Sequence, residues 1–296
     1  MIVAITGATG FVGTRLVERA LAAGHNVRAL TRRPQPARAG MTWVAGALED
    51  APALADLTAG ADAVVHVAAA VNAPDRAGFA AANVAGTAAV VAASAGRRFV
   101  HVSSLAAREP ALSDYGWSKA EAERVVMASG LDWTIVRPPA VYGPGDLELR
   151  DVFRLANLGL ALLPPPGRIS IVHVDDIARL LLACAVHKAG PVILEPEDAS
   201  GGMTHAAFAQ AVGAAVGRRV MPLPLPRGLL SAAAWLDGRV RGAGAKLTPD
   251  RVGYLCHPDW TADPAKAPPA ALWQPEIATA AGMRETAAWY RANGLL

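Results

Sequence analysis

A serine, a tyrosine and a lysine have the residue types and the spacing of a proton-transfer site. Tyr115 and Lys119 are four residues apart in the run YGWSK, so a helix would place both side chains on one face. An ammonium beside a phenol stabilises the phenolate, which makes the tyrosine a usable general acid or base near neutral pH. Ser104 precedes Tyr115 by 11 residues and could hold the reacting oxygen.

The lysine at position 119 is unusual for this composition. The chain has 28 basic residues, and four of them are lysines. Lysine provides a compact, hydrated point charge, whereas arginine would bring a wide planar fork. A solvated pair on the surface of an amphipathic helix is the alternative interpretation of Tyr115 and Lys119. The composition favours the chemical role.

A glycine-rich turn near the N-terminus predicts a phosphate site. The apolar run at residues 2–6 stops at Gly7, Gly10 and Gly13, and a helical pattern follows directly. Glycines let the backbone turn tightly and approach a phosphate, and the new helix directs its free N–H groups at the phosphate. This order of strand, turn and helix suits a dinucleotide pyrophosphate. A turn with a structural role only is the alternative.

Strand and helix patterns alternate through the first half of the chain. This rhythm predicts the α/β class, with a Rossmann-type doubly wound parallel sheet and helices on both faces. Ligands of such sheets bind beyond the carboxyl ends of the strands, where the glycine turn and Ser104 would lie. The expected strands are residues 2–6, 26–31, 42–46, 63–69, 98–103 and 133–137, and the expected helices are 11–23, 51–57, 78–94 and 113–128.

Beyond Pro138 the pattern loosens and predicts a second domain. Proline clusters interrupt the chain and helical segments dominate. We expect residues 1–145 to form the Rossmann domain and residues 169–195 to rejoin it. Residues 146–168 and 196–296 would form a smaller, mostly helical substrate-binding domain. The apolar stretches 158–163 and 223–230 would line a hydrophobic substrate pocket or belong to ordinary core.

Composition limits the partners. The net charge is +3, and the arginine pairs lack interleaved aromatic residues, so we expect no nucleic-acid partner. Cys184 and Cys256 are far apart and predict reduced thiols in a cytoplasmic protein. The histidines lack metal-ligand spacing, so we expect no metal. Without a signal sequence or a run of roughly 20 apolar residues, we also expect no membrane partner.

Several motifs together resemble the extended short-chain dehydrogenase/reductase family, which is NAD-dependent epimerase/dehydratase-like. The resemblance covers nearly the whole chain and includes its C-terminal end. The motifs are TGATGFVG (6–13), HVAA (66–69), NVAGT (83–87), VSS (102–104), YGWSK (115–119), RPPAVYGPGD (137–146) and HVDDIA (173–178).

The resemblance implies a site and a cofactor. It implies that residues 1–145 bind NAD(P), with Tyr115 as acid/base, Lys119 at the nicotinamide ribose and Ser104 orienting the substrate oxygen. Asn83 would brace the central helix. The residues implied in cofactor binding are Gly7, Gly10, Phe11, Val12, Gly13, Ala68, Ala69, Lys119, Pro138 and Val141.

The second expected strand ends in Thr31-Arg32-Arg33, where NAD-binding family members usually carry an acidic residue. A guanidinium can form charge-assisted hydrogen bonds with the 2′-phosphate of NADP. We therefore predict a preference for NADP(H), with NAD(H) as the other possibility. A solvated arginine pair is the alternative interpretation.

Departures from the family pattern shape the functional hypotheses. Leu105-Ala106 stands where family dehydratases carry Asp-Glu, which argues against dehydration.

The leading hypothesis is an NADP-dependent oxidoreductase that transfers hydride to or from a carbonyl or secondary alcohol on a small-molecule substrate. A nucleotide-sugar epimerase with tightly bound cofactor is the second. Because the gap between Ser104 and Tyr115 is short, a non-catalytic NADP-binding scaffold or redox sensor, like the complex I accessory-subunit branch, is the third. Family members often form homodimers.

Overall fold

The computed structural model describes residues 1–187, 190–245 and 247–296. The chain divides into two compact units, each of which is discontinuous in sequence. The first unit comprises Met1–Pro138, Asp175–Pro196 and Ala265–Gln274. The second unit comprises Pro139–Val174, Glu197–Pro264 and Pro275–Leu296.

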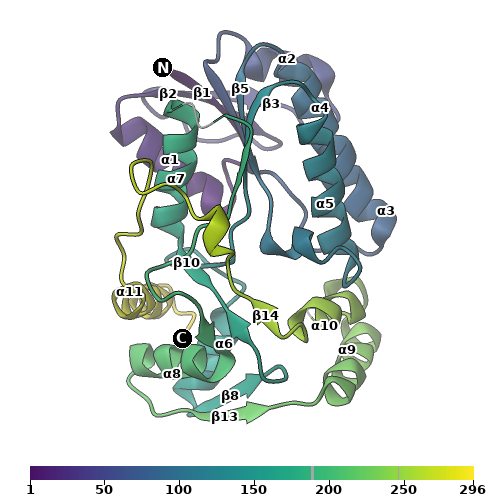
Figure 1. The fold of residues 1–296 in the computed structure, drawn as a ribbon, viewed down its shortest axis with the longest axis vertical. Coiled ribbons are helices and arrows are strands. Elements are labelled where there is room, and N and C mark those ends of the chain that lie inside the picture. Colours follow the sequence, from purple (N-terminus) through teal and green to yellow (C-terminus); the bar gives the residue numbers. More distant parts are fainter. Residues whose placement is uncertain (188–189, 246) are drawn as a thin grey trace. The chain divides into compact units, whose positions relative to one another are not determined.

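A parallel sheet forms the centre of the first unit (Figure 1). Seven strands from the described residues pair in the order β11-β6-β5-β4-β1-β2-β3. Every pairing in this sheet is parallel, and the strand order reverses direction beside β1. The Rossmann-type fold is therefore confirmed. The strands are β1 Ile2–Thr6, β2 Asn26–Thr31, β3 Met41–Ala45, β4 Ala63–His66, β5 Arg98–Val102, β6 Asp132–Val136 and β11 Val192–Leu194.

The helices of the first unit bury apolar side chains against this sheet. Leu54, Leu57, Val90 and Val126 pack with Phe99 of β5 in one core cluster. Local capping fixes two helix starts, because the side chain of Asp50 accepts from Ala53 N and that of Ser113 from Gly116 N. The helices are α1 Phe11–Ala22, α2 Ala51–Thr58, α3 Arg76–Phe79, η1 Ala80–Ala85, α4 Gly86–Ala93, η2 Leu105–Arg108, α5 Asp114–Met127, α7 Val174–Val186 and η4 Pro264–Lys266.

Three of these elements, α3, η1 and α4, follow one another without a break from Arg76 to Ala93. The middle part, η1, is π-helical, a form that frequently marks functional sites. By length and composition alone the whole stretch could cross a membrane, with 28% of it buried. Core helices of globular proteins meet the same criterion, and Phe79 and Val90 are buried within the first unit.

The second unit combines helices with short strands around its own core, which contains Tyr142, Phe153 and Tyr290. Three small sheets pair as β10-β7, β12-β9-β14 and β13-β8. The strands are β7 Ala140–Tyr142, β8 Leu160–Leu163, β9 Arg168–Ile169, β10 Ile171–His173, β12 Met203–Thr204, β13 Met221–Pro224 and β14 Asp259–Trp260. The helices are α6 Arg150–Asn157, α8 His205–Val216, α9 Arg227–Arg241, η3 Gly242–Gly244, α10 Pro249–Leu255 and α11 Thr279–Ala292.

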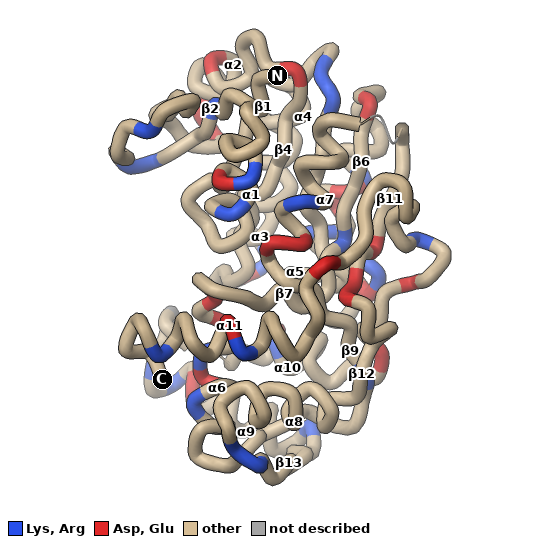
Figure 2. The backbone as a smooth tube through the Cα atoms, turned by 90° about the vertical axis from the view of Figure 1, so that its left-hand side faces the viewer, with Lys and Arg blue, Asp and Glu red and all other residues tan. Residues whose placement is uncertain are grey.

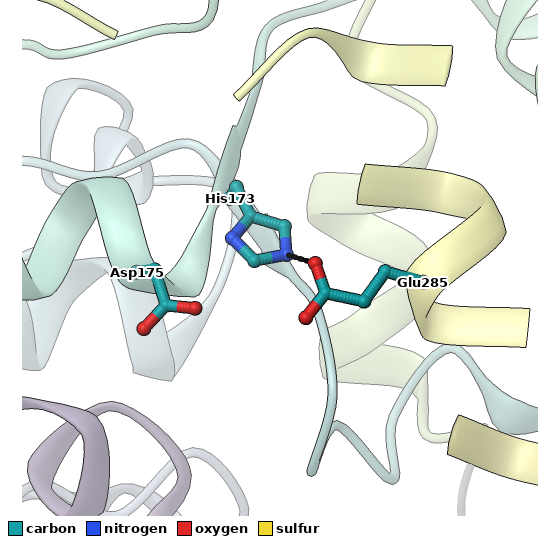
Figure 3. A group of neighbouring side chains, drawn as sticks. All are labelled: His173, Asp175 and Glu285. Atoms are coloured by element: carbon teal, nitrogen blue, oxygen red, sulfur yellow. Dashed lines mark ion pairs between the residues drawn. The ribbon is translucent and has the colours of Figure 1, made fainter. Parts of the chain in front are cut away.

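A buried histidine ties β10 to α11 in this unit. The ring of His173 packs edge-on against Tyr142 of β7, with 5.3 Å between ring centroids. Its Nε2 atom faces the exposed carboxylate of Glu285 at an ion-pair distance of 3.6 Å (Figure 3). A side chain on Gly282 would collide with both rings, because its Cβ would lie 2.8 Å from atoms of His173 and Tyr142.

The return of the chain to the main sheet differs from the expectation for residues 169–195. Val192–Leu194 does join the sheet, beside β6. Residues 169–174 do not, because β10 pairs in parallel with β7 in the second unit. The apolar pattern of this segment does not specify a partner strand, and β7 after the Pro138-Pro139 pair was not foreseen. Ala265–Gln274 also belongs to the first unit, although the expected boundaries assigned it to the second.

Candidate active site

The glycine turn at the start of α1 is tightly packed around two of its three glycines. Gly7 has φ +72°, and a Cβ there would lie 2.7 Å from Ala68 N. A Cβ on Gly13 would lie 2.0 Å from Gly7 O. The chain's own packing therefore requires both glycines. Gly10 is different, because it is exposed, it is the N-cap of α1, and its Cβ would meet Gly7 O at 3.3 Å.

Packing constrains Gly10 less than it constrains Gly7 and Gly13. Its φ of −85° is open to any residue, so the backbone conformation does not require glycine there. The helix N-terminus adds free N–H groups and a positive dipole end, which suits a pyrophosphate. Phe11 and Val12 form the first turn of α1 and are partly exposed.

A buried histidine links the loop after β4 to the sheet. Ala68 N donates to Thr6 Oγ1 at 3.3 Å, and Ala69 follows as an exposed residue. His66 lies between Thr6 Oγ1 at 2.7 Å and Thr87 Oγ1 at 3.0 Å. Burial, aided by the charge of Lys119, lowers the pKa of His66 to about 3. His66 is therefore a neutral hydrogen-bonding group at physiological pH.

Asn83 joins this loop to the helix that carries the tyrosine and the lysine. Its amide accepts from Ala70 N at 2.7 Å and donates to Ala70 O at 2.9 Å. It also donates to Ser118 Oγ at 2.9 Å, and Ser118 donates to Tyr115 O. Asn83 lies in the π-helical segment η1 and is 1% exposed. This geometry agrees with the bracing role expected for it.

Lys119 is buried at the carboxyl end of β5. Its side chain is 2% exposed, and Nζ donates to Val102 O at 2.8 Å. Tyr115 precedes it by one turn of α5 and is partly exposed, with its ring 6.1 Å from that of Phe79. Ser104 follows Val102 by two residues, and its Oγ accepts from Ala106 N at 3.2 Å. Lys119 and Ser104 thus both lie at the carboxyl end of β5, and Tyr115 is one helical turn from the lysine.

Burial dominates the titration of Lys119. It lowers the pKa of the ammonium to about 8, although the nearby charge of Glu123 acts in the opposite direction. The ammonium is therefore mostly protonated at neutral pH and loses its proton in the mildly alkaline range.

A buried ion network supports the same edge of the sheet, and sequence reasoning missed it. Ser103 Oγ donates to Glu123 Oε1 at 2.5 Å. Arg137 binds both oxygens of Glu123, at 2.8 and 2.6 Å, and binds Glu195 at 3.2 Å. Arg108 holds the other oxygen of Glu195 at 3.1 Å. Burial alone would lower the pKa of Arg137, but the two carboxylates raise it above its ordinary value.

One sequence signal could have indicated part of this network. Glu123 lies one helical turn after Lys119, on the same face, which predicts contact between them. The pairing of Arg137 with Glu195 bridges 58 residues and has no local signal.

Arg32 and Arg33 follow β2 as exposed residues. The hydroxyl of Thr31 donates to Arg33 O at 2.7 Å and shapes this turn. Within the described part of the chain, neither guanidinium takes part in an ion pair. Because β2 pairs with β1, the arginines and the glycine turn share the carboxyl edge of the sheet.

The two remaining predicted residues belong to different units. Pro138 follows β6 and is buried, and its carbonyl accepts from Leu105 N at 3.2 Å, beside Ser104. Val141 lies on β7 of the second unit, opposite Val172. The structure therefore gathers the other predicted residues on the first unit, and Val141 lies outside that group.

A glycine turn at a helix start lies where the strand order reverses, and this arrangement is typical of dinucleotide-binding α/β proteins. A family model described as NAD(P)H-binding matches residues 7–188. Ceramide reductase from Caulobacter vibrioides is 38% identical over 311 residues, which cover 100% of this chain and 96% of that protein. The chain belongs to this NAD(P)H-binding family.

Solved structures agree on the fold. MoeE5 in complex with UDP-glucose and NAD has a TM-score of 0.75 and 23% identity, and the match covers 99% of both chains. The Bordetella bronchiseptica enzyme WbmG in complex with NAD has a TM-score of 0.76 and 21% identity, covering 100% of this chain and 95% of the other. At these identities the likeness shows the fold.

Replacing Gly13 should mainly lower stability, whereas replacing Gly10 should mainly weaken nucleotide binding. Gly13→Ala should lower the free energy of unfolding by about 1–3 kcal/mol, because its Cβ collides with Gly7 O. Gly10→Ala should change stability by less than about 1 kcal/mol and weaken binding of NADPH or NADH. Thermal unfolding and fluorescence titration measure the two effects. Unchanged nucleotide affinity in Gly10→Ala would show that the turn has a structural role only.

Lys119 predicts a specific pH dependence of stability. Between about pH 8 and pH 10.5 the folded lysine is neutral while the unfolded one is protonated. Because the unfolded state then binds more protons, stability should rise with pH in this window by about 3 kcal/mol. Lys119→Met should lack that rise. Denaturant unfolding across the window compares the two proteins, and parallel curves would contradict a buried ammonium.

Proposed function

We propose that this protein is an NADP(H)-dependent reductase of a lipid carbonyl, with Tyr115, Lys119 and Ser104 as its catalytic residues. The observation that carries the proposal is the buried ammonium of Lys119, held by Val102 O one helical turn after Tyr115. Burial of an ammonium costs free energy of folding, and buried ionisable groups with shifted pKa values are concentrated at functional sites.

Each residue would have a distinct role. When bound, the nicotinamide supplies the hydride in reduction and accepts it in oxidation. In reduction, the hydroxyl of Tyr115 donates its proton to the carbonyl oxygen, which becomes the product hydroxyl. The charge of Lys119 stabilises the phenolate that remains until solvent returns a proton. Ser104 accepts a backbone hydrogen bond, so its own O–H is able to donate to the same substrate oxygen.

Two exposed arginines support the choice of NADP(H). Arg32 and Arg33 stand after β2, the strand whose end meets the adenosine ribose in this fold class. Both guanidinium groups are exposed, and a 2′-phosphate would offer them charge-assisted hydrogen bonds. An acidic residue, which would repel that phosphate, is absent from Thr31-Arg32-Arg33.

The substrate class is inferred from the full-length relative. The ceramide reductase of Caulobacter vibrioides matches this chain from end to end. We therefore propose a ceramide-class lipid that carries a carbonyl group. A panel of such lipids with NADPH, monitored by nicotinamide absorbance, tests this substrate class.

Nucleotide-sugar epimerisation is the second candidate, because MoeE5, which binds UDP-glucose and NAD, shares the fold. An epimerase regenerates its cofactor in each cycle, so net consumption of NADPH argues against it. Release of tightly bound NAD(H) from purified protein, together with turnover of UDP-glucose, would replace the reductase proposal.

The arginines predict cofactor discrimination. Arg32→Ala and Arg33→Ala should each raise the dissociation constant of NADPH about 10- to 100-fold, because each removes a charge-assisted contact. The dissociation constant of NADH should stay nearly constant. Arg124→Ala is a matched control, since Arg124 is exposed on α5 and pairs with Glu121. Equal weakening of both nucleotides, or none, would contradict a 2′-phosphate site.

Tyr115→Phe should lower kcat for lipid reduction by on the order of 10²–10⁴, the typical loss of a general acid. The ring stays in place, so NADPH affinity and unfolding temperature should be unchanged. Single-turnover kinetics with NADPH and a carbonyl lipid measure the loss. If wild type and variant both bind NADPH but turn over none of the lipids or sugars, a cofactor-binding scaffold is the better interpretation.

A further inference from the structure

Helix α9 of the second unit exposes an apolar stripe. Leu229, Ala233, Leu236 and Val240 follow one another at spacings of four, three and four residues, which places them on one helix face. A stripe of this kind normally packs inward. Here all four side chains are exposed, and Val240 is 74% exposed. Among the described residues of α9, Ala234 on a different face is buried.

The strands that precede α9 in the sequence also expose apolar side chains. In β8, Ala161 and Leu163 are buried, whereas Leu160 and Leu162 face solvent. β13 pairs in parallel with β8, so Met221 lies opposite Leu160. β13 ends at Pro224, and α9 begins three residues later at Arg227. We call the exposed side chains of Leu158, Leu160, Leu162, Met221, Leu229, Leu236 and Val240 the apolar surface.

Positive charge is concentrated in the segment that contains β13 and α9. Residues 218–241 contain five arginines and one aspartate, a net charge of +4, while the whole chain has +3. All five arginines are exposed, and Figure 2 shows blue segments beside α9 and β13. The guanidinium of Arg239 lies over the ring of Trp235, 4.1 Å from its centroid. Trp235 is itself 58% exposed. An exposed tryptophan with arginine neighbours is typical of helices that lie in a membrane interface.

We propose that the apolar surface docks the protein on a lipid bilayer that contains anionic phospholipids. The apolar stripe of α9 enters the boundary between headgroups and acyl chains, and the arginines bind the headgroup phosphates. A second copy of this chain is a poorer occupant, because its own surface would bring the same positive charge. Monomeric globular proteins rarely expose large apolar patches without a binding role.

This proposal concerns docking and not insertion. The expectation of no membrane partner rested on the lack of a spanning run and a signal sequence. A 15-residue interfacial helix requires neither. The proposal stands independently of the reductase reaction, since vesicle binding is measured without substrate or cofactor.

Co-sedimentation of the full chain with vesicles tests the docking. Vesicles of phosphatidylcholine alone are compared with vesicles that also contain phosphatidylglycerol. Wild type should partition at least about tenfold more strongly onto the anionic vesicles, because each arginine near the surface contributes about 1 kcal/mol. Added salt should weaken this binding.

Two variants and one control identify the surface. The double variant Leu236→Ser/Val240→Ser should reduce anionic-vesicle binding at least about tenfold, because two apolar side chains no longer enter the bilayer. Arg239→Ser/Arg241→Ser should remove most of the preference for phosphatidylglycerol. Met127→Ser removes an exposed apolar side chain at the end of α5 and should bind as wild type does. Because all these side chains are exposed, the unfolding temperatures should stay constant.

Three outcomes would overturn the proposal. The first is equal binding of wild type to both vesicle types or to neither. The second is unchanged vesicle binding in Leu236→Ser/Val240→Ser. The third is a wild-type dimer in light scattering that this double variant converts to a monomer while wild type binds no vesicles, which would assign the surface to a second copy of the chain.

Discussion

The ammonium of Lys119 is buried among the strands and helices of the first unit, and much of the polar structure around it follows from that one charge. A buried ammonium needs an oxygen partner, and Val102 O can provide it because β5 ends at that residue. The charge also reaches two buried histidines. Burial lowers the pKa of both His66 and His101, and the charge of Lys119 lowers both further. The pKa of His101 lies well below its ordinary value.

The neutral histidines and the ion network keep positive charge from accumulating at this edge. His66 and His101 stack with ring centroids 5.4 Å apart, which would be costly if both were charged. Glu123 lies near Lys119 and is held in place by Arg137 and Ser103. Replacing one member of a buried network of this kind leaves an unpaired charge, so the network fixes the positions of β5, α5 and β6 relative to one another.

Local sequence patterns identified much of the fold and most of the candidate site, because both depend on short-range chemistry. The strand–glycine–helix order around Gly7 and the one-turn spacing of Tyr115 and Lys119 are local, and the structure places both at the carboxyl edge of the sheet. Long-range partners were not accessible in this way. The pairing of β10 with β7 and the contact of Arg137 with Glu195 depend on tertiary packing, which a single sequence does not encode locally.

Helix α9 also shows that a local sequence pattern does not specify which face of a helix is buried. Its apolar spacing predicts a helix with one buried face, and the sequence left pocket and core as the two alternatives for residues 223–230. In the structure, Leu229 is exposed and the buried side of α9 is the side of Ala234. Most helical stability in proteins comes from packing of the apolar face, and α9 packs a different, smaller face within its unit. The free energy that the exposed stripe would gain by burial is therefore still available for binding, and an interfacial lipid environment is one in which its arginines and its leucines are both satisfied.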